Sequence, residues 1–474
     1  MKRSLLGTAA LLCLLTGPAS AGPALDAFLT LMLEGAEVRH ASDRVEGAEE
    51  VYEGLEISVG GDLVRLEGAR FTLTEGAVRL VGDRVRFTRA EGGGAEIAQV
   101  DLSIPLAIGS LPAGSLLMGE NGARISPELC DALRTPVRAS GSGITFGSGD
   151  KIASARLDAS VSGPDAACLL DLTQEMTGAD LTDPAGLGLR FAEQRIQLKT
   201  PVTPGLPEVA TGEIWSSNFS LTDAEILMNG TVELRLDRLE SGTLINGDSL
   251  LPLAAAGHTR ALAKAITAGT LPEGQLPWAD LWNGMRSVVG EGRISLSGLE
   301  VVGSGLSALT GVSGPLDPGS RIDFNGTALK DENGLTASLT LDGTKTALLA
   351  VDVGIVTGPA DPSFNDLPPS ALLTGAPLSL SGAAIRFSDR GAGSLVERII
   401  GADPYTVLAG VLPGWVGAEK AAIVSAWADQ SRNGGVAALR AAPAEPVPAL
   451  TIGMMGLGDW GQLGALLNVT QGGE

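Results

Sequence analysis

The sequence is poor in the side chains on which most enzyme chemistry depends. Its 474 residues include 3 Cys and 2 His, and aromatic residues make up 4%. His40 and His258 are far apart, no His-Glu-x-x-His zinc motif occurs, and no complete Gly-x-Ser-x-Gly turn or Gly-Lys-Ser/Thr phosphate loop is present. We therefore expect a protein that is not an enzyme, with no cofactor and no metal site.

Basic residues are also scarce relative to acidic ones. The chain has 33 Lys and Arg against 55 Asp and Glu, a net charge of -22 at pH 7. This balance repels phosphate backbones and argues against nucleic acid as a partner. The many carboxylates keep one enzymatic alternative open, a cell-wall glycan hydrolase with paired acids.

The first 21 residues have the three parts of a secretory signal peptide in order. Residues 1–3 are positively charged, residues 4–17 are apolar, and Ala19-Ser20-Ala21 is a small-residue cleavage site. We expect cleavage after Ala21, so that the mature chain begins at Gly22 and is periplasmic; an uncleaved anchor is the alternative. No later run is long enough to span a bilayer, so we expect no transmembrane segment in the mature chain.

Two cysteines remain after this cleavage, Cys130 and Cys168. An even pair in an exported chain favours a disulfide, which would close a loop of about 37 residues and contribute roughly 3–4 kcal/mol. Two free buried thiols are the alternative, since two thiols without a nearby histidine make a poor zinc site.

The hydrophobic pattern predicts a mainly β (α+β) fold, with long antiparallel meanders of twisted sheet and inserted amphipathic helices. Apolar and polar residues alternate in residues 63–88, where Gly68, Gly76 and Gly82 suggest turns between short strands. The same alternation predicts strands in residues 152–161, 187–198, 213–239, 293–302, 321–329, 335–341, 347–356 and 378–387. Asp331-Glu332-Asn333-Gly334 predicts a hairpin turn, because Asn-Gly tolerates positive φ.

Helical spacing predicts several short helices between these strands. They are expected in residues 24–33, 253–268, 278–289, 394–400, 418–430 and 459–467. Ser394 and Glu397 match a capping box at the start of one of them.

The chain is long enough for two domains after the signal peptide. Strands predominate before residue 245, and strands mixed with helices follow it. We expect an N-terminal β-meander domain with the disulfide at 22–245 and a mixed β/α domain at 246–474, with 200–207 and 360–377 as Pro-rich joints. One continuous elongated domain is the alternative.

Two surfaces could carry function. The polar side of the first meander is a candidate anion-binding face, formed by Arg65, Arg70, Arg79, Arg84, Arg86 and Arg89. Guanidinium groups bind phosphate or carboxylate bidentately, although cross-strand ion pairs on a solvated face explain the same residues. The apolar side of the meanders either closes under helices as an ordinary core or stays partly open as a groove for acyl chains.

Residues 385–470 contain segments that recur in a known group of proteins. They are Ile385-Arg386-Phe387-Ser388-Asp389-Arg390-Gly391 with a helix to Ile400, a helix at Trp427 before Gly434-Gly435, the strand to Leu439, residues 443–448, and Leu466-Leu467-Asn468-Val469-Thr470. This stretch resembles uncharacterised exported β-rich proteins of Gram-negative bacteria, and more distantly the AsmA-like envelope proteins. The resemblance implies a link to lipid handling and supplies no catalytic residues.

Together these observations predict a non-catalytic periplasmic envelope protein. The expected partner is an envelope lipid or another hydrophobic ligand, or a periplasmic protein, bound through a β-sheet surface. A structural or accessory scaffold of an envelope complex is the second hypothesis.

Overall fold

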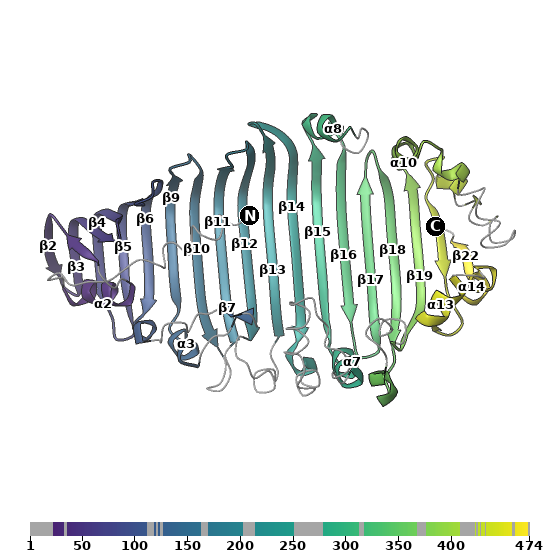
Figure 1. Ribbon diagram of the computed structural model, residues 1–474, viewed down its shortest axis with the longest axis horizontal. Coiled ribbons are helices and arrows are strands. Elements are labelled where there is room, and N and C mark those ends of the chain that lie inside the picture. The colour runs from purple at the N-terminus through teal and green to yellow at the C-terminus, as the bar shows by residue number, and fades with distance from the viewer. Residues whose placement is uncertain are drawn as a thin grey trace. The chain divides into compact units, whose positions relative to one another are not determined.

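The computed structural model describes residues 22–32, 36–110, 118–119, 122–123, 127–162, 169–201, 214–250, 278–311, 317–366, 376–407, 422, 425–426, 428–431, 433–456 and 460–472. Within them the chain is mainly β, with antiparallel strands and short helices, as the sequence predicted (Figure 1). The predicted signal peptide, the predicted helix at 253–268 and Cys168 lie outside the described residues. No described helix is long and apolar enough to cross a membrane.

The chain divides into two compact units. Unit 1 comprises residues 1–205 and 219–221, and unit 2 comprises residues 206–218 and 222–474. The division therefore falls between residues 205 and 222, at the predicted 200–207 joint, whereas residue 245 lies inside strand β14 (Thr231–Asn246). Strand β13 (Ile214–Met228) contains the short segment assigned to unit 1.

Unit 1 is an antiparallel meander. Its strands are β1 (Glu37–Arg39), β2 (Ser42–Glu46), β3 (Glu49–Val59), β4 (Asp62–Leu73), β5 (Ala77–Thr88), β6 (Gly94–Pro105), β9 (Val137–Phe146), β10 (Lys151–Ser162), β11 (Leu169–Thr182) and β12 (Leu187–Pro201). Strand β3 pairs with β1, β2 and β4, and from β4 each strand pairs with the next in this order. The residues between β6 and β9 include η1 (Leu106–Ser110), α3 (Pro127–Ala132) and the separate pair β7 (Met118–Gly119) and β8 (Gly122–Ala123).

The strands of unit 1 are longer than predicted, because Gly68 and Gly82 lie inside β4 and β5 rather than in turns. Of the three glycines in that run, only Gly76 falls between strands. The two halves of these strands are separated by a local irregularity, at which residues on both paired strands drop out of the ladder while the register continues unchanged. Residues at the middle of alternate strands have positive φ: Gly54 in β3, Arg84 in β5, Gly143 in β9 and Gly178 in β11.

These irregularities shift the alternation of side chains by one residue. Leu66 and Ala69 in β4, like Ile97 and Val100 in β6, are three residues apart, yet both members of each pair belong to the same buried core. Ala153 of β10 lies at the same level as Gly143 of β9 and Gly178 of β11. A Cβ at Gly178 would lie 2.7 Å from the Cβ of Ala153, so both φ and space require glycine there. We call this row of mid-strand irregularities the mid-strand row.

The N-terminal helix covers the apolar side of the first strands of unit 1. Helix α2 (Pro23–Met32), which the sequence predicted, packs against β4 and β5. Leu25 and Phe28 are 0% and 5% exposed, and the Phe28 and Phe71 rings meet edge to face with centroids 5.3 Å apart. This end of the sheet is therefore a closed, well-packed core.

Unit 2 is built on a second antiparallel meander. Its strands include β14 (Thr231–Asn246), β15 (Gly290–Val301), β16 (Arg321–Lys330), β17 (Gly334–Gly343), β18 (Ala347–Thr357), β19 (Leu378–Asp389), β20 (Ala437–Ala441), β21 (Val447–Pro448) and β22 (Val469–Gly472). Strands β14 to β20 pair in sequence order; β21 also pairs with β19, and β22 with β20.

Short helices lie between and after these strands. They are η2 (Gly247–Leu250), α7 (Trp278–Arg286), α8 (Gly305–Thr310), η3 (Pro362–Asp366), α10 (Ala392–Ile400), α13 (Ala449–Gly456) and α14 (Trp460–Leu466). The helices predicted near 278, 394 and 459 are thus confirmed. Of the one predicted at 418–430, residues 422, 425–426 and 428–430 are described and helical.

Of two local predictions in unit 2, one is wrong and the other is confirmed but has a different physical cause from the one expected. The capping box is wrong: α10 begins at Ala392, its cap Gly391 makes no side-chain cap, and Ser394 lies within the helix. The 331–334 turn is confirmed, but neither Asn333 nor Gly334 has positive φ. Instead, the Asp331 carboxylate accepts hydrogen bonds from the backbone N–H groups of Asn333 and Gly334, both at 2.8 Å.

Candidate functional site

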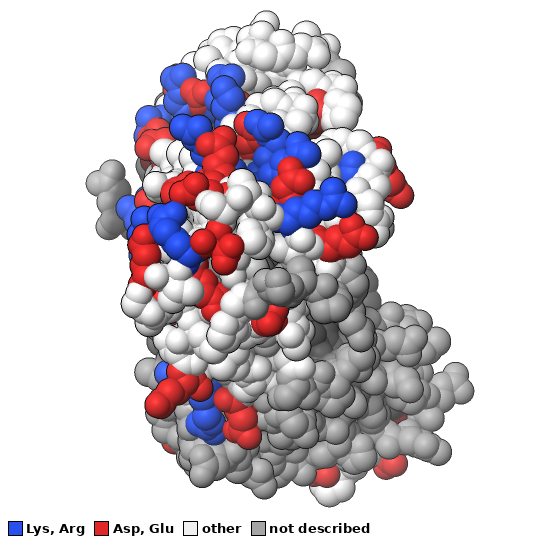
Figure 2. Space-filling model, turned by 90° about the vertical axis from the view of Figure 1, so that its left-hand side faces the viewer, with Lys and Arg blue, Asp and Glu red and all other residues white. Residues whose placement is uncertain are grey.

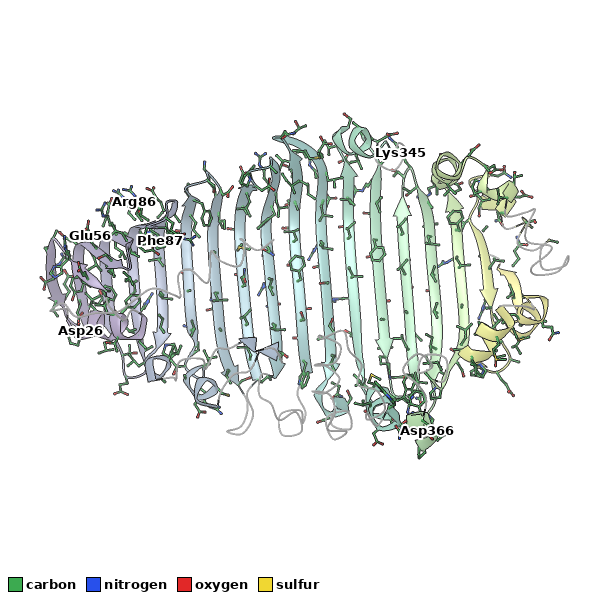
Figure 3. The ribbon with its side chains drawn as sticks, in the orientation of Figure 1. Asp26, Glu56, Arg86, Phe87, Lys345 and Asp366 are labelled. Carbon is green, nitrogen blue, oxygen red and sulfur yellow. The ribbon has the colours of Figure 1, made fainter. Side chains whose placement is uncertain are left out.

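The arginine-rich side of unit 1 is a surface of paired charges. Four of the six predicted arginines contact a carboxylate on a neighbouring strand: Arg65–Glu56 at 2.7 Å, Arg79–Asp101 at 2.6 Å, Arg84–Glu67 at 2.7 Å and Arg86–Glu96 at 2.6 Å. Glu56 and Arg86 lie in the same part of unit 1 (Figure 3). On the side seen in Figure 2, the basic and acidic residues that are described alternate rather than separate into patches.

The remaining two arginines make weaker contacts. The Arg89 guanidinium carbon lies 5.8 Å from the centroid of the Phe87 ring, at the limit of a cation–π contact. Arg70 is exposed, and its charge helps the nearer Arg44 to lower the pKa of Glu46. An anion that bound this surface would compete with carboxylates already in place, so its role as an anion-binding face stays a prediction.

The best-formed pair on this surface is bidentate. The Arg79 Nε and Nη2 donate to the two oxygens of Asp101, at 2.9 and 2.6 Å. This hydrogen bonding lowers the pKa of Asp101 and raises that of Arg79. Both side chains are substantially exposed, at 55% and 42%, so the pair contributes little to stability.

The predicted cysteine pair is described at one end only. Cys130 in α3 is 4% exposed, and its sulfur is disulfide-bonded. It packs with Leu133, Val137 and Val161 in a small core beside β9 and β10. Because Cys168 lies outside the described residues, the pairing of the two stays a prediction.

Of the two histidines, His40 lies among the described residues. His40 makes an edge contact with Tyr52, with ring centroids 5.3 Å apart, and lies 3.8 Å from Asp43. His258 lies outside the described residues. Over the ranges that the structure describes, no three His, Cys, Asp or Glu side chains are grouped as metal ligands.

The apolar side of unit 2 remains partly exposed. Directly opposed residues of an antiparallel pair project to the same face, so the registers define two rows across the strands. One row is Leu296, Phe324, Leu341, Leu349 and Phe387, and the next is Leu339, Val351, Ile385 and Leu439. All nine side chains are neither buried nor fully exposed, and we call this surface the open apolar face.

The opposite side of the same strands is polar. The residues in the alternate row are Arg293, Thr327, Ser338, Asp352, Ala384 and Arg440. These residues line part of a shallow hollow of about 660 Å³ that extends over β15 to β20. Asp352 also lies 3.9 Å from Arg386.

This hollow does not bring two acids into a catalytic pair. Among the described residues that line it, the carboxylates are those of Glu291 and Asp352. They lie on β15 and β18, three strands apart, which at about 4.8 Å per strand separates them by about 14 Å. Glycosidase carboxylates are roughly 5–10 Å apart.

Sequence reasoning located the alternating strands but not which of their faces would stay open. The alternation of residues 321–356 contains five of the nine side chains of the open apolar face, yet exposure depends on what packs against them. The polar row with Arg293 and Arg440 follows from strand register, which residue spacing alone does not define.

Comparison with known proteins gives no relative for this chain. No protein-family model matches it, and no curated protein matches it either.

Proposed function

We propose that this chain is an exported, non-catalytic envelope protein that binds the acyl chains of a lipid on the open apolar face of unit 2. The observation that carries the proposal is the partial exposure of a continuous aliphatic surface. From β15 to β19 it spans about 19 Å at ordinary strand spacing, comparable with the roughly 15 Å hydrocarbon depth of one bilayer leaflet. Large exposed apolar patches mark binding sites for partners or lipids.

The composition of this face favours a lipid over a protein. Its nine side chains are aliphatic except for Phe324 and Phe387. Protein interfaces depend on Trp, Tyr and Arg as anchors, and none of these residue types occurs among the nine. Acyl chains need only a continuous apolar surface, which β16 to β19 supply.

The scaffold alternative requires recognition through sheet edges. Strand β2 pairs with β3, and all five of its residues are exposed. Asp43, Arg44 and Glu46 place charges along it, which is how sheets discourage the addition of another strand. A glycan hydrolase is supported still less, because the acids of the hollow are about 14 Å apart.

Export is the second part of the proposal. Residues 1–21 have the pattern of a cleaved signal peptide, and a Cys130–Cys168 disulfide suits the oxidising periplasm. The disulfide state of Cys130 supports this compartment.

Native mass spectrometry of the protein purified from periplasm tests the lipid proposal. We expect a co-purifying lipid mass with the native chain and its loss from Leu339→Glu, which places a charge in the open apolar face. Thr340→Glu is the matched control, since it adds the same charge to the next residue of β17 on the opposite side. Thr340→Glu should keep the lipid.

The results separate the proposals. A gently extracted native chain without lipid, or equal lipid loss in both variants, contradicts binding on this face. A single dominant protein in crosslinking within cells, with no lipid, supports the scaffold instead.

A further inference from the structure

The beginning of α2 is held by side chains from β3. The carbonyl of Gly22 accepts the first helical hydrogen bond, from Asp26 N at 2.9 Å, so Gly22 is the N-cap of the helix. Glu50, 7% exposed, accepts hydrogen bonds from Ala24 N at 2.7 Å and Leu25 N at 3.0 Å. A carboxylate of β3 thus replaces the capping side chain that Gly22 lacks, at the positive end of the helix.

The backbone nitrogen of Gly22 enters the same cluster. Gly22 N donates to the Tyr52 hydroxyl at 2.9 Å, and that hydroxyl donates to Glu50 Oε2 at 3.2 Å. Burial raises the pKa of Tyr52, so the phenol stays neutral and can accept one bond while it donates the other. Within the described residues, Glu50 makes no ion pair, so its buried charge is held by neutral donors alone.

A side chain at position 22 would require the Glu50 carboxylate to move. A Cβ there would lie 2.3 Å from the carboxyl carbon of Glu50 and 2.5 and 2.6 Å from its oxygens. The Cα of Gly22 therefore lies directly against the carboxylate. This is also the residue at which the mature chain begins if the signal peptide is cleaved after Ala21.

We propose that signal-peptide cleavage after Ala21 creates a binding group for Glu50: the new α-ammonium of Gly22 forms an ion pair with this buried carboxylate and locks α2 onto the sheet. Hydrolysis of the Ala21–Gly22 peptide bond leaves a carboxylate on Ala21 and an amine on Gly22, which takes up a proton. The one N–H of the uncleaved chain becomes three donors with a positive charge. This inference rests on the proposed export.

The charge balance around the amine favours such a pair. Glu50 and Tyr52 approach from β3, and Asp26 lies in the first turn of α2 (Figure 3). His40 contacts Tyr52, and Asp43 lies near enough to raise the pKa of that phenol slightly. The surroundings are therefore mainly acidic, and an opposite charge within about 4–6 Å favours the charged form of the amine.

The test compares two chains that differ only in whether Ala21 precedes Gly22. We expect the chain that begins at Gly22 to unfold about 2–4 °C higher at pH 6.5. The difference should shrink above about pH 8, where the ammonium loses its proton. It should also disappear in Glu50→Gln but persist in Glu49→Gln, a change to the adjacent acid of β3, which projects to the other face of the strand.

If Glu50→Gln does not fold, acetylation of the Gly22 amine in the native sequence removes the charge instead and should lower the Tm to that of the extended chain. Equal Tm values for the two chains overturn the inference. The intact mass of the periplasmic protein separates the two proposals. A chain that starts at Gly22 without a Tm difference contradicts only the ion pair. A chain that retains residues 1–21 contradicts cleavage after Ala21, and with it the cleaved form of the proposed exported protein.

Discussion

The apolar face near the start of unit 1 and the apolar face of unit 2 have similar side chains but differ in exposure. Both consist of aliphatic and phenylalanine side chains on antiparallel strands. In unit 1, α2 packs on β4 and β5, and Phe71 is 0% exposed. In unit 2, Phe324 and its neighbours stay partly exposed. The same strand pattern therefore yields a core in one unit and an available surface in the other.

This difference separates side chains that hold the protein together from side chains free to bind. A buried residue already has its contacts, and its removal leaves a cavity. A partly exposed residue has contacts on one side only, so its removal costs less in folding and more in binding.

The largest effect is expected from matched truncations in the two faces. Phe71→Ala should lower the free energy of unfolding by about 3–5 kcal/mol, because it empties a closed core. Phe324→Ala should lower it by about 1 kcal/mol, since that residue is already partly exposed in the folded protein. Urea denaturation of both variants measures the contrast. Equal losses would show that the open apolar face is packed as tightly as the core.

The next effect concerns the cysteine of unit 1. Cys130→Ser should destabilise the oxidised protein by roughly 3–4 kcal/mol, if the sulfur is bonded to Cys168 and closes a loop of about 37 residues. Urea denaturation with and without a reductant measures it. The reductant should destabilise the native chain and leave Cys130→Ser unchanged. If the reductant did not change the free energy of unfolding of the native chain, this result would support two free thiols.

A smaller effect is expected at the mid-strand row. Gly178→Ala should cost about 1–2 kcal/mol, because its φ of 57° suits glycine and its new Cβ would meet Ala153. Gly292→Ala in β15 of unit 2 is the control, since no atom lies within 4 Å of a Cβ there. It should be close to neutral. Thermal unfolding of both variants measures the loss of stability. An unchanged Tm in Gly178→Ala would mean that the strand accommodates the side chain.

The smallest effect belongs to the charged surface of unit 1. Arg79→Ala should cost no more than about 1 kcal/mol at pH 7. The lowered pKa of Asp101 adds stability above the ordinary aspartate range that is lost as pH falls through the folded value. In Arg79→Ala that pKa should return toward its usual value, as carboxyl NMR can measure. Arg293→Ala, which removes an arginine with no ion pair among the described residues, should leave Asp101 unchanged.

The sequence was sufficient for the fold class and for most of unit 2. Alternation predicted β16, β17, β18 and β19 within about two residues, because these strands keep period two over most of their length; the register shift between β18 and β19 at Gly354 lies near one end of the pair. In the 213–239 run it missed the turn at Asn229 and Gly230, both of which have positive φ. In unit 1 it missed β3, β6, β9 and β11, whose alternation changes phase in mid-strand or is diluted by small and polar residues.

The candidate site was predictable only in part. The arginines were found from spacing, but their carboxylate partners lie on neighbouring strands and follow from register. The cluster of Gly22, Glu50 and Tyr52 carried no local signal. It joins a helix start to a strand 28 residues later in the chain, and nothing in Glu49-Glu50-Val51-Tyr52 marks one glutamate as buried.

The mid-strand row has a consequence for how such strands tolerate change. Each strand changes phase at the same level as its neighbours, so the register continues unchanged through the row. Loss of one residue at this level from β11 alone would turn every side chain beyond it to the other side, and apolar groups would face water. Point substitutions elsewhere in these strands can be absorbed one at a time, but an insertion or deletion must arise in every paired strand together. Strand length in unit 1 is therefore a shared property of the sheet.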